Sequence, residues 1–319
     1  MQVLITFPGQ GTQRAGMLKD LPAESAVAAV LAEAQEVLEV PVAAMDTPER
    51  LQSTVWTQLC LLTSGVAMAR CLAAHDARAD AVAGLSIGAY AAAVVAGVLA
   101  FADALRLVRL RGELMAQAYP GGYGMTAILG LDRNRLAPLV AQVCSPQRPV
   151  YLANFNAPTQ IVIAGSEAAM AEVSALALAA GAQAAKPVAI HVPSHCLLLD
   201  DAARALQQAM QGVAVRAPSL RYFSASRARE LRDPRQIADD LALNMATPVR
   251  WHETMLLAHA NGARLVVETP PGDVLTRLAQ PVFTDGMSVA CDRTRLDSIA
   301  AMVRRHSKAG SLPGTGRDP

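Results

Sequence analysis

The sequence predicts an α/β protein in which a small unit interrupts a larger one. Short apolar segments alternate with helix-forming segments over residues 1–122, and the same alternation returns over 198–306. The intervening segment, 123–197, has its own order of strands and helices. Apolar residues make up 52% of the chain and aromatic residues only 4%, a composition that suits Ala- and Leu-rich helices packed on a sheet.

Bulk composition narrows the possible functions. The 28 basic and 27 acidic residues give a net charge of +1 without a dense basic run, so nucleic acid is not expected as a partner. The N-terminus, "MQVLITFPGQGTQ", has no pattern typical of an export signal. We expect a cytoplasmic protein without disulfides or a metal site, because its five cysteines are scattered: Cys60, Cys71, Cys144, Cys196 and Cys291.

Residues 80–101 are nearly free of charge and long enough to cross a membrane. Ala and Gly dominate the segment, however, and no basic flank or aromatic belt marks its ends, so we expect no membrane span. Division at Ser86 gives a strand over 81–85, a sharp turn, and a helix over 89–99. In that setting Gly84-Leu85-Ser86-Ile87-Gly88 is typical of a nucleophile elbow, which presents a strained serine at the edge of a sheet. The alternative is a packing turn of small residues.

The next segment, 103–118, carries an arginine in an apolar stripe. Helical periodicity places Leu107, Arg111, Leu114 and Ala118 on one face. Desolvation of an unpaired cation is costly, so Arg111 needs a carboxylate partner. It forms either an internal ion pair or a bidentate clamp on a substrate carboxylate. A clamp beside an acyl-accepting serine would select a dicarboxylic half-thioester such as malonyl.

The small unit follows, and its segments predict the order β, α, β, β, α, β. This is the order of a ferredoxin-like unit inserted into the larger domain. The segments are 124–131, 132–143, 149–156, 159–165, 166–181 and 185–192. Farther along, 263–271 is expected to be a strand and 272–280 a helix. The Gly- and Pro-rich end, 307–319, is expected to be a mobile tail.

A serine nucleophile requires a base, and a histidine is the expected one. His195 follows the strand 185–192 and a turn at Pro193, where its side chain can reach into a cleft facing Ser86. His191 lies within that strand and is the alternative that spacing alone leaves open. The other histidines are expected to be solvated or structural: His75, His252, His259 and His306.

At this point the chain resembles the malonyl-CoA:acyl carrier protein transacylase family. Six stretches in the family order carry the resemblance: "FPGQGTQ", "GLSIGAY", "RLRGELM", "VPSHC", "NMATPVRW" and "VVETPPGDVL". The resemblance implies an α/β-hydrolase-like core with Ser86 as nucleophile, His195 as base and Arg111 as the malonyl clamp. It further implies an oxyanion hole from Gln10 and the backbone N–H of Ile87. The backbone carbonyl of Asn244 would orient His195.

Two positions depart from the usual family elbow, Gly-His-Ser-Leu-Gly-Glu, because Leu85 replaces the histidine and Ala89 the glutamate. Leu85 and Ala89 are therefore both expected to affect contact with CoA and its pantetheine arm. The chain looks most similar to the malonyl transferase (epsilon) subunit of biotin-independent malonate decarboxylase. That similarity implies transfer of malonyl from malonyl-CoA to a carrier subunit with a phosphoribosyl-dephospho-CoA arm, and transient contact with other decarboxylase subunits.

Three alternatives remain open. The first is a malonyl-CoA:acyl carrier protein transacylase of fatty acid or polyketide synthesis, which would perform the same chemistry on another carrier. The second is a serine thioesterase or hydrolase, and the third is a noncatalytic assembly subunit. Both malonyltransferase hypotheses imply that no cofactor is bound permanently. Malonyl-CoA is then a substrate, and the acceptor is a phosphopantetheine-type thiol arm on the carrier protein.

Overall fold

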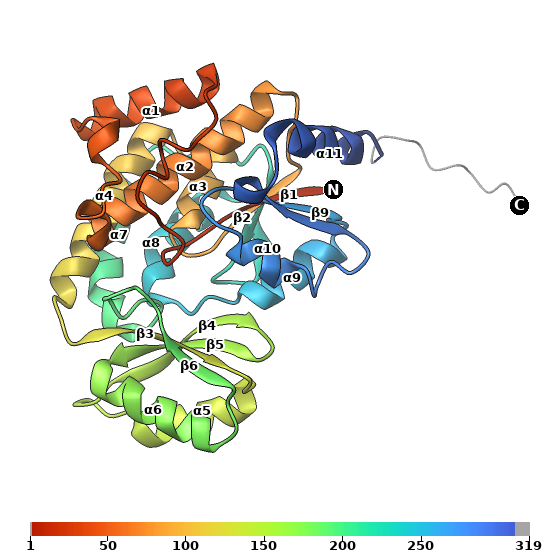
Figure 1. Cartoon of the computed structure of the whole chain (residues 1–319). Coiled ribbons are helices and arrows are strands. Elements are labelled where there is room, and N and C mark those ends of the chain that lie inside the picture. The colour runs from red at the N-terminus through yellow and green to blue at the C-terminus, as the bar shows by residue number, and fades with distance from the viewer. Residues whose placement is uncertain (1, 310–319) are drawn as a thin grey trace, which may run out of the picture.

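A six-stranded sheet forms the larger unit, with strand order β10-β9-β1-β2-β7-β8 (Figure 1). Five of its strands are parallel, and β8 pairs antiparallel with β7. The strands are β1 (Val3–Phe7), β2 (Ala81–Gly84), β7 (Arg221–Ser224), β8 (Arg229–Leu231), β9 (Leu265–Glu268) and β10 (Met287–Ala290). The structure is a computed structural model, and it describes residues 2–309.

Side chains that alternate along the strands fill two hydrophobic clusters on opposite faces of the sheet. Ile5 and Val82 join one cluster, whereas Leu4 and Ala83 join the other. The first cluster takes in α1 (Ser25–Leu38), α2 (Thr54–Ala74), α3 (Gly88–Val95), α4 (Phe101–Ala118), α7 (Asp200–Gln211), α8 (Pro234–Leu243) and α11 (Leu296–Ala309). The second takes in α9 (Trp251–Ala260) and α10 (Val274–Ala279). Helices therefore cover both faces, as a mostly parallel sheet requires.

Among the described residues, helix α2 is long and apolar enough to cross a membrane. Its apolar window is 83% buried inside the protein, where α2 packs against α1, α3 and α4. It is therefore accounted for as a core helix. The segment 80–101 forms strand β2, a turn and helix α3. That helix ends at Val95, earlier than expected, because Gly97 takes a φ of 78°.

A four-stranded antiparallel sheet forms the smaller unit, which lies below the larger sheet in Figure 1, with strand order β4-β5-β3-β6. Its elements are β3 (Tyr123–Leu129), α5 (Arg133–Val143), β4 (Val150–Ala157), β5 (Gln160–Ser166), α6 (Glu167–Ala179) and β6 (Ala184–Pro187). One face of this sheet packs on α5 and α6. The other face carries Met125 and Val162, which cluster with Cys196 of the following segment. The α/β class predicted from the sequence is confirmed.

Two further expected boundaries are wrong. The strand expected over 185–192 ends at Pro187, because the N–H of Ile190 bonds to the carbonyl of Val188 in a tight turn instead of to β3. His191 is therefore exposed and outside any strand. At the C-terminus α11 continues to Ala309, past the expected start of the tail, and residues 310–319 of that tail lie outside the described residues.

Candidate active site

The turn between β2 and α3 is built around two glycines. A Cβ on Gly84 would lie 2.1 Å from the carbonyl carbon of Gly88, and a Cβ on Gly88 would lie 2.1 Å from the carbonyl oxygen of Phe7. No side chain fits at either position. Between them Ser86 adopts a φ of 55°, in the left-handed region that is strained for a residue with a side chain. The tight packing of strand on helix thus fixes Ser86 in a turn where it is half-buried.

His195 is the histidine that the structure places beside this serine. Its Nε2 lies 2.8 Å from Ser86 Oγ, within the reach required of a general base. Its Nδ1 lies 2.8 Å from the carbonyl oxygen of Asn244 and 3.1 Å from that of Thr247. Carbonyl oxygens only accept, so Nδ1 carries the proton and Nε2 is free to take one from Ser86.

The electrostatic surroundings keep this imidazole neutral. Burial, and after it the positive charge of Arg111, lower the pKa of His195 from its ordinary value of 6.5 to about 4, while the two carbonyl bonds act in the opposite direction. The ring is 2% exposed. Near neutral pH it is therefore available as a proton acceptor.

Arg111 is fully buried, and its guanidinium points at Ser86. Its Nη1 donates to Gln58 Oε1 at 2.5 Å, and its Nη2 lies 3.2 Å from both Ser86 Oγ and Asn244 Oδ1. Its Nε has no hydrogen-bond partner. Burial lowers the pKa of Arg111 to about 10, which still leaves it charged near neutral pH. Within residues 2–309 no carboxylate pairs with it, so the internal ion pair that the sequence left open is not formed.

The helical face that carries Arg111 differs from the expected one. Ala104 and Met115 are buried with Arg111, whereas Leu114 is half-buried and Ala118 is exposed. The stripe is rotated because α4 packs against both α2 and α7. Arg111 lies on both the expected and the observed buried face of α4, so the expectation that it is buried is unaffected.

Gln10 is held by two side chains from α2. Its Oε1 accepts from Thr54 Oγ1 at 3.0 Å and from Gln58 Nε2 at 3.1 Å. Gln58 thereby joins Gln10 to Arg111. The sequence reasoning missed Gln58, although a glutamine inside a long apolar helix is the signal that could have found it. Ile87 is the buried N-cap residue of α3, and the N–H groups that follow it, those of Gly88 and Ala89, donate to the carbonyls of Leu85 and Ser86.

A cavity of about 220 Å³ opens over Ser86 between the two units. The larger unit contributes Gln10, Leu85 and Ser86, and the smaller unit contributes Met125, Ala127, Asn154, Asn156 and Val162. His195 reaches the cavity from the segment that follows β6. The side-chain oxygens of Asn154 and Asn156 are buried without a hydrogen-bond partner. Sequence reasoning did not single out these two asparagines.

The described part of the chain holds no group of three or more His, Cys, Asp or Glu side chains that could bind a metal ion. All five cysteines are free thiols. The site instead joins a serine in contact with a neutral imidazole, the helix N-cap at Ile87 and a buried cation. This combination supports acyl transfer to and from the serine oxygen.

Comparison with known proteins identifies the family. The model of the acyl transferase domain matches residues 5–309. The chain belongs to the acyl transferase domain family. It is an acyltransferase, and a malonyl CoA-acyl carrier protein transacylase from Haemophilus influenzae is 36% identical to it over 293 residues, which cover 90% of this chain and 94% of the relative.

Solved structures extend the comparison to this acyltransferase's fold. An acyl carrier protein S-malonyltransferase from Vibrio cholerae is 37% identical with a TM-score of 0.88, and the match covers 94% of this chain and 100% of that one. A malonyl-transacylase in complex with a type II PKS acyl-carrier protein is 35% identical with a TM-score of 0.89, over 96% and 100% of the two chains. None of these three relatives is a malonate decarboxylase subunit, so the finer resemblance to the epsilon subunit is not supported.

Proposed function

We propose that this acyltransferase moves malonyl from malonyl-CoA to the thiol of an acyl carrier protein through an ester on Ser86. The observation that carries the proposal is the buried Arg111, whose Nη2 lies 3.2 Å from Ser86 Oγ and which no carboxylate of the described residues neutralises. A cation desolvated in this way favours an anionic ligand, and its planar fork matches a carboxylate. The malonyl-specific names of the relatives agree with this choice.

In the first step His195 Nε2 accepts the Ser86 proton while the serine oxygen bonds to the thioester carbonyl carbon. The carbon–sulfur bond then breaks, the imidazolium gives its proton to the departing CoA sulfur, and malonyl-Ser86 remains. Arg111 transfers its hydrogen bond from Ser86 Oγ to the malonyl carboxylate. Binding of the malonyl carboxylate therefore frees the Ser86 oxygen from its hydrogen bond with Arg111.

In the second step the carrier thiol gives its proton to His195 and attacks the ester carbonyl. The bond to the serine oxygen breaks, and Ser86 recovers the proton. CoA must leave before the carrier enters the same cavity, so the kinetics are expected to be ping-pong.

Gln10 and the backbone N–H of Ile87 are proposed as the oxyanion donors. Thr54 and Gln58 bond to the carboxamide oxygen of Gln10, and this arrangement leaves its NH₂ group available to the substrate. Gln10→Ala is expected to lower kcat by about a hundredfold, the typical effect of losing one oxyanion donor. Steady-state transfer assays would measure this loss. Gln52→Ala, at an exposed neighbouring glutamine, is the control and should stay near the parent value.

The unpartnered oxygens of Asn154 and Asn156 suit a substrate that brings amide N–H donors into the cavity. A pantetheine-type arm carries such amides between its thiol and its phosphate. We assign these asparagines to the arm shared by CoA and the carrier. Leu85 lines the same cavity and supplies an apolar contact there, whereas Ala89 is buried in α3 and is not among the cavity-lining residues.

The acceptor is proposed to be an acyl carrier protein of the kind named for the relatives, rather than the decarboxylase carrier expected from the sequence. We also infer that the smaller unit is a ferredoxin-like insertion in an α/β-hydrolase-like core, which its strand order β6-β3-β5-β4 and its βαββαβ connectivity support. The domain boundaries near 122 and 198 and the cytoplasmic location stay predictions.

Mass spectrometry of the intact protein tests the proposal. After incubation with malonyl-CoA, a malonyl adduct is expected on Ser86, and holo acyl carrier protein should remove it with formation of malonyl-carrier. Ser86→Ala should form no adduct. Release of free malonate without carrier loading would instead indicate a hydrolase, and absence of any adduct would indicate a noncatalytic subunit.

A further inference from the structure

Three backbone carbonyls converge on His195 from one short turn. The turn is the 3-10 helix η4 (Asn244–Ala246), which follows directly after α8. The carbonyls of Asn244 and Thr247 accept from Nδ1, and the carbonyl of Met245 accepts the backbone N–H of His195 at 2.6 Å. His195 itself has a φ of 64°, so its backbone is held in a strained conformation by these contacts.

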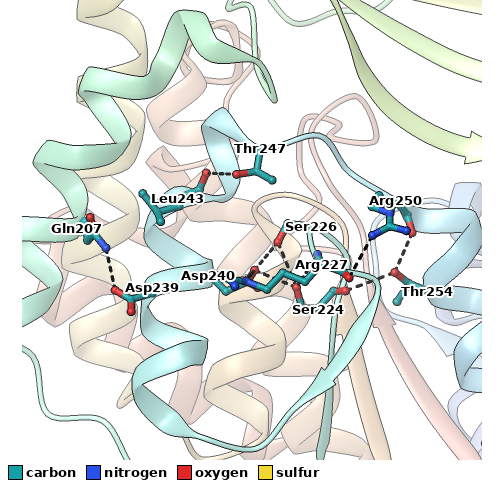
Figure 2. A network of polar contacts seen from close by, with 10 residues as sticks. All are labelled: Gln207, Ser224, Ser226, Arg227, Asp239, Asp240, Leu243, Thr247, Arg250 and Thr254. Atoms are coloured by element: carbon teal, nitrogen blue, oxygen red, sulfur yellow. Dashed lines mark hydrogen bonds and ion pairs between the residues drawn. The ribbon is translucent and has the colours of Figure 1, made fainter.

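Thr247 closes this turn with its own side chain. Its hydroxyl donates to the carbonyl of Leu243 at 3.0 Å, as Figure 2 shows, and its backbone N–H donates to the carbonyl of Asn244 at 3.2 Å. The hydroxyl therefore ties the end of the turn back to its beginning. Its effect is to turn the Thr247 carbonyl toward the imidazole.

The carbonyl that receives the hydroxyl is itself well anchored. Asp240 is 3% exposed, and its carboxylate accepts from Ser224, Ser226 and Arg227, which fixes α8 against the end of β7 (Figure 2). Leu243 is the last residue of that helix. Thr247 is thus bonded to a rigid support rather than to a mobile loop.

We propose that Thr247 is a positioning residue for His195, acting by holding a second backbone acceptor on Nδ1. When Ser86 loses its proton, the imidazolium that forms needs an acceptor at Nδ1, a need that many serine enzymes meet with a carboxylate. Among the described residues, the charged group that acts on this ring is Arg111 of α4, and it disfavours the imidazolium. The carbonyls of Asn244 and Thr247 act against the charge of Arg111, because they accept from Nδ1 and thereby favour the imidazolium.

The inference rests on the proposed function, because malonyl transfer is the reaction in which Thr247 would position His195. It can nevertheless be tested without any acyl substrate. Phenylmethanesulfonyl fluoride is the probe: the Ser86 oxygen bonds to sulfur, fluoride leaves, and His195 takes the proton. The pH dependence of this reaction reports the state of His195 whatever the natural acyl group is.

Thr247→Val keeps the shape of the side chain and removes its hydroxyl. We expect sulfonylation of Ser86 and kcat for malonyl transfer both to fall about tenfold, with KM for malonyl-CoA unchanged. Loss of a bond to the charged ring lowers the pKa of His195, so the acid limb of the pH profile should move to lower pH. Thr247→Ser, which keeps the hydroxyl, should show the parent rates of sulfonylation and malonyl transfer and the parent acid limb of the pH profile.

The matched control is Thr254→Val. Thr254 also donates its hydroxyl to the carbonyl four residues earlier, that of Arg250, at 2.8 Å, and more weakly to that of Ser224 at 3.5 Å. It lies in α9, and the described hydrogen bonds of His195 go to other residues. The proposal is overturned if the Thr247 and Thr254 variants share one pH profile and rate, or if Thr247→Ser behaves like Thr247→Val. Sulfonylation that follows the expected pattern in a protein unable to transfer malonyl would refute the proposed function alone.

Discussion

Replacement of His195 by alanine is expected to lower kcat for malonyl transfer by about ten-thousandfold or more, because it removes the base that lies within hydrogen-bond reach of the Ser86 hydroxyl in the described part of the chain. Steady-state transfer and the rate of malonyl-Ser86 formation would both report the loss. Residual activity would come from the oxyanion donors and from substrate binding, which the substitution leaves in place.

The control is His191→Ala. His191 is exposed and lines a neighbouring cavity of about 210 Å³ instead of the one over Ser86, so this variant is expected to keep nearly full activity. Comparison of the two variants decides between the two histidines that sequence spacing left open. Equal losses in both variants would show that the assignment of the base is wrong.

Arg111→Ala is expected to lower kcat/KM for malonyl-CoA by about a thousandfold, because removing one partner of a buried charge pair costs roughly 2–5 kcal/mol. Acetyl-CoA, which has no carboxylate, should gain relative to malonyl-CoA. Competition between the two thioesters for Ser86 measures the ratio. Arg106→Ala, at an exposed position of the same helix, should leave it unchanged. A parent-like preference for malonyl in the Arg111 variant would contradict the clamp.

Arg111→Ala should also change the pH dependence of Ser86 acylation, and the structure predicts the direction of the change. The charge of Arg111 helps to lower the pKa of His195 to about 4, and His195 acts as a base only when it is neutral. In the parent the acid limb of acylation should therefore lie near pH 4. Removal of the cation raises the pKa of His195, so the limb should move to higher pH. An unchanged limb would mean that Arg111 does not act on the ring.

Much of the fold and part of the candidate site follow from local rules that the sequence carries. The elbow can be predicted from the sequence because only glycine fits at positions 84 and 88 where a strand turns sharply into a helix. The βαββαβ order is readable because strand and helix periods differ. Burial of Arg111 is readable because residues three and four apart on a helix share a face. Each of these inferences depends on neighbours within a few positions.

What the tertiary structure alone decided involves residues far apart in the chain. Ser86, Arg111, His195 and Asn244 come from four separate segments, and no spacing rule predicts that Arg111 reaches Ser86 instead of a carboxylate. The choice of His195 over His191 depended on the 2.8 Å contact of His195 Nε2 with Ser86 Oγ, which joins residues 109 positions apart. Contacts of this kind depend on how whole helices and sheets pack, and the free energy of that packing is shared among many distant residues rather than encoded at the site itself.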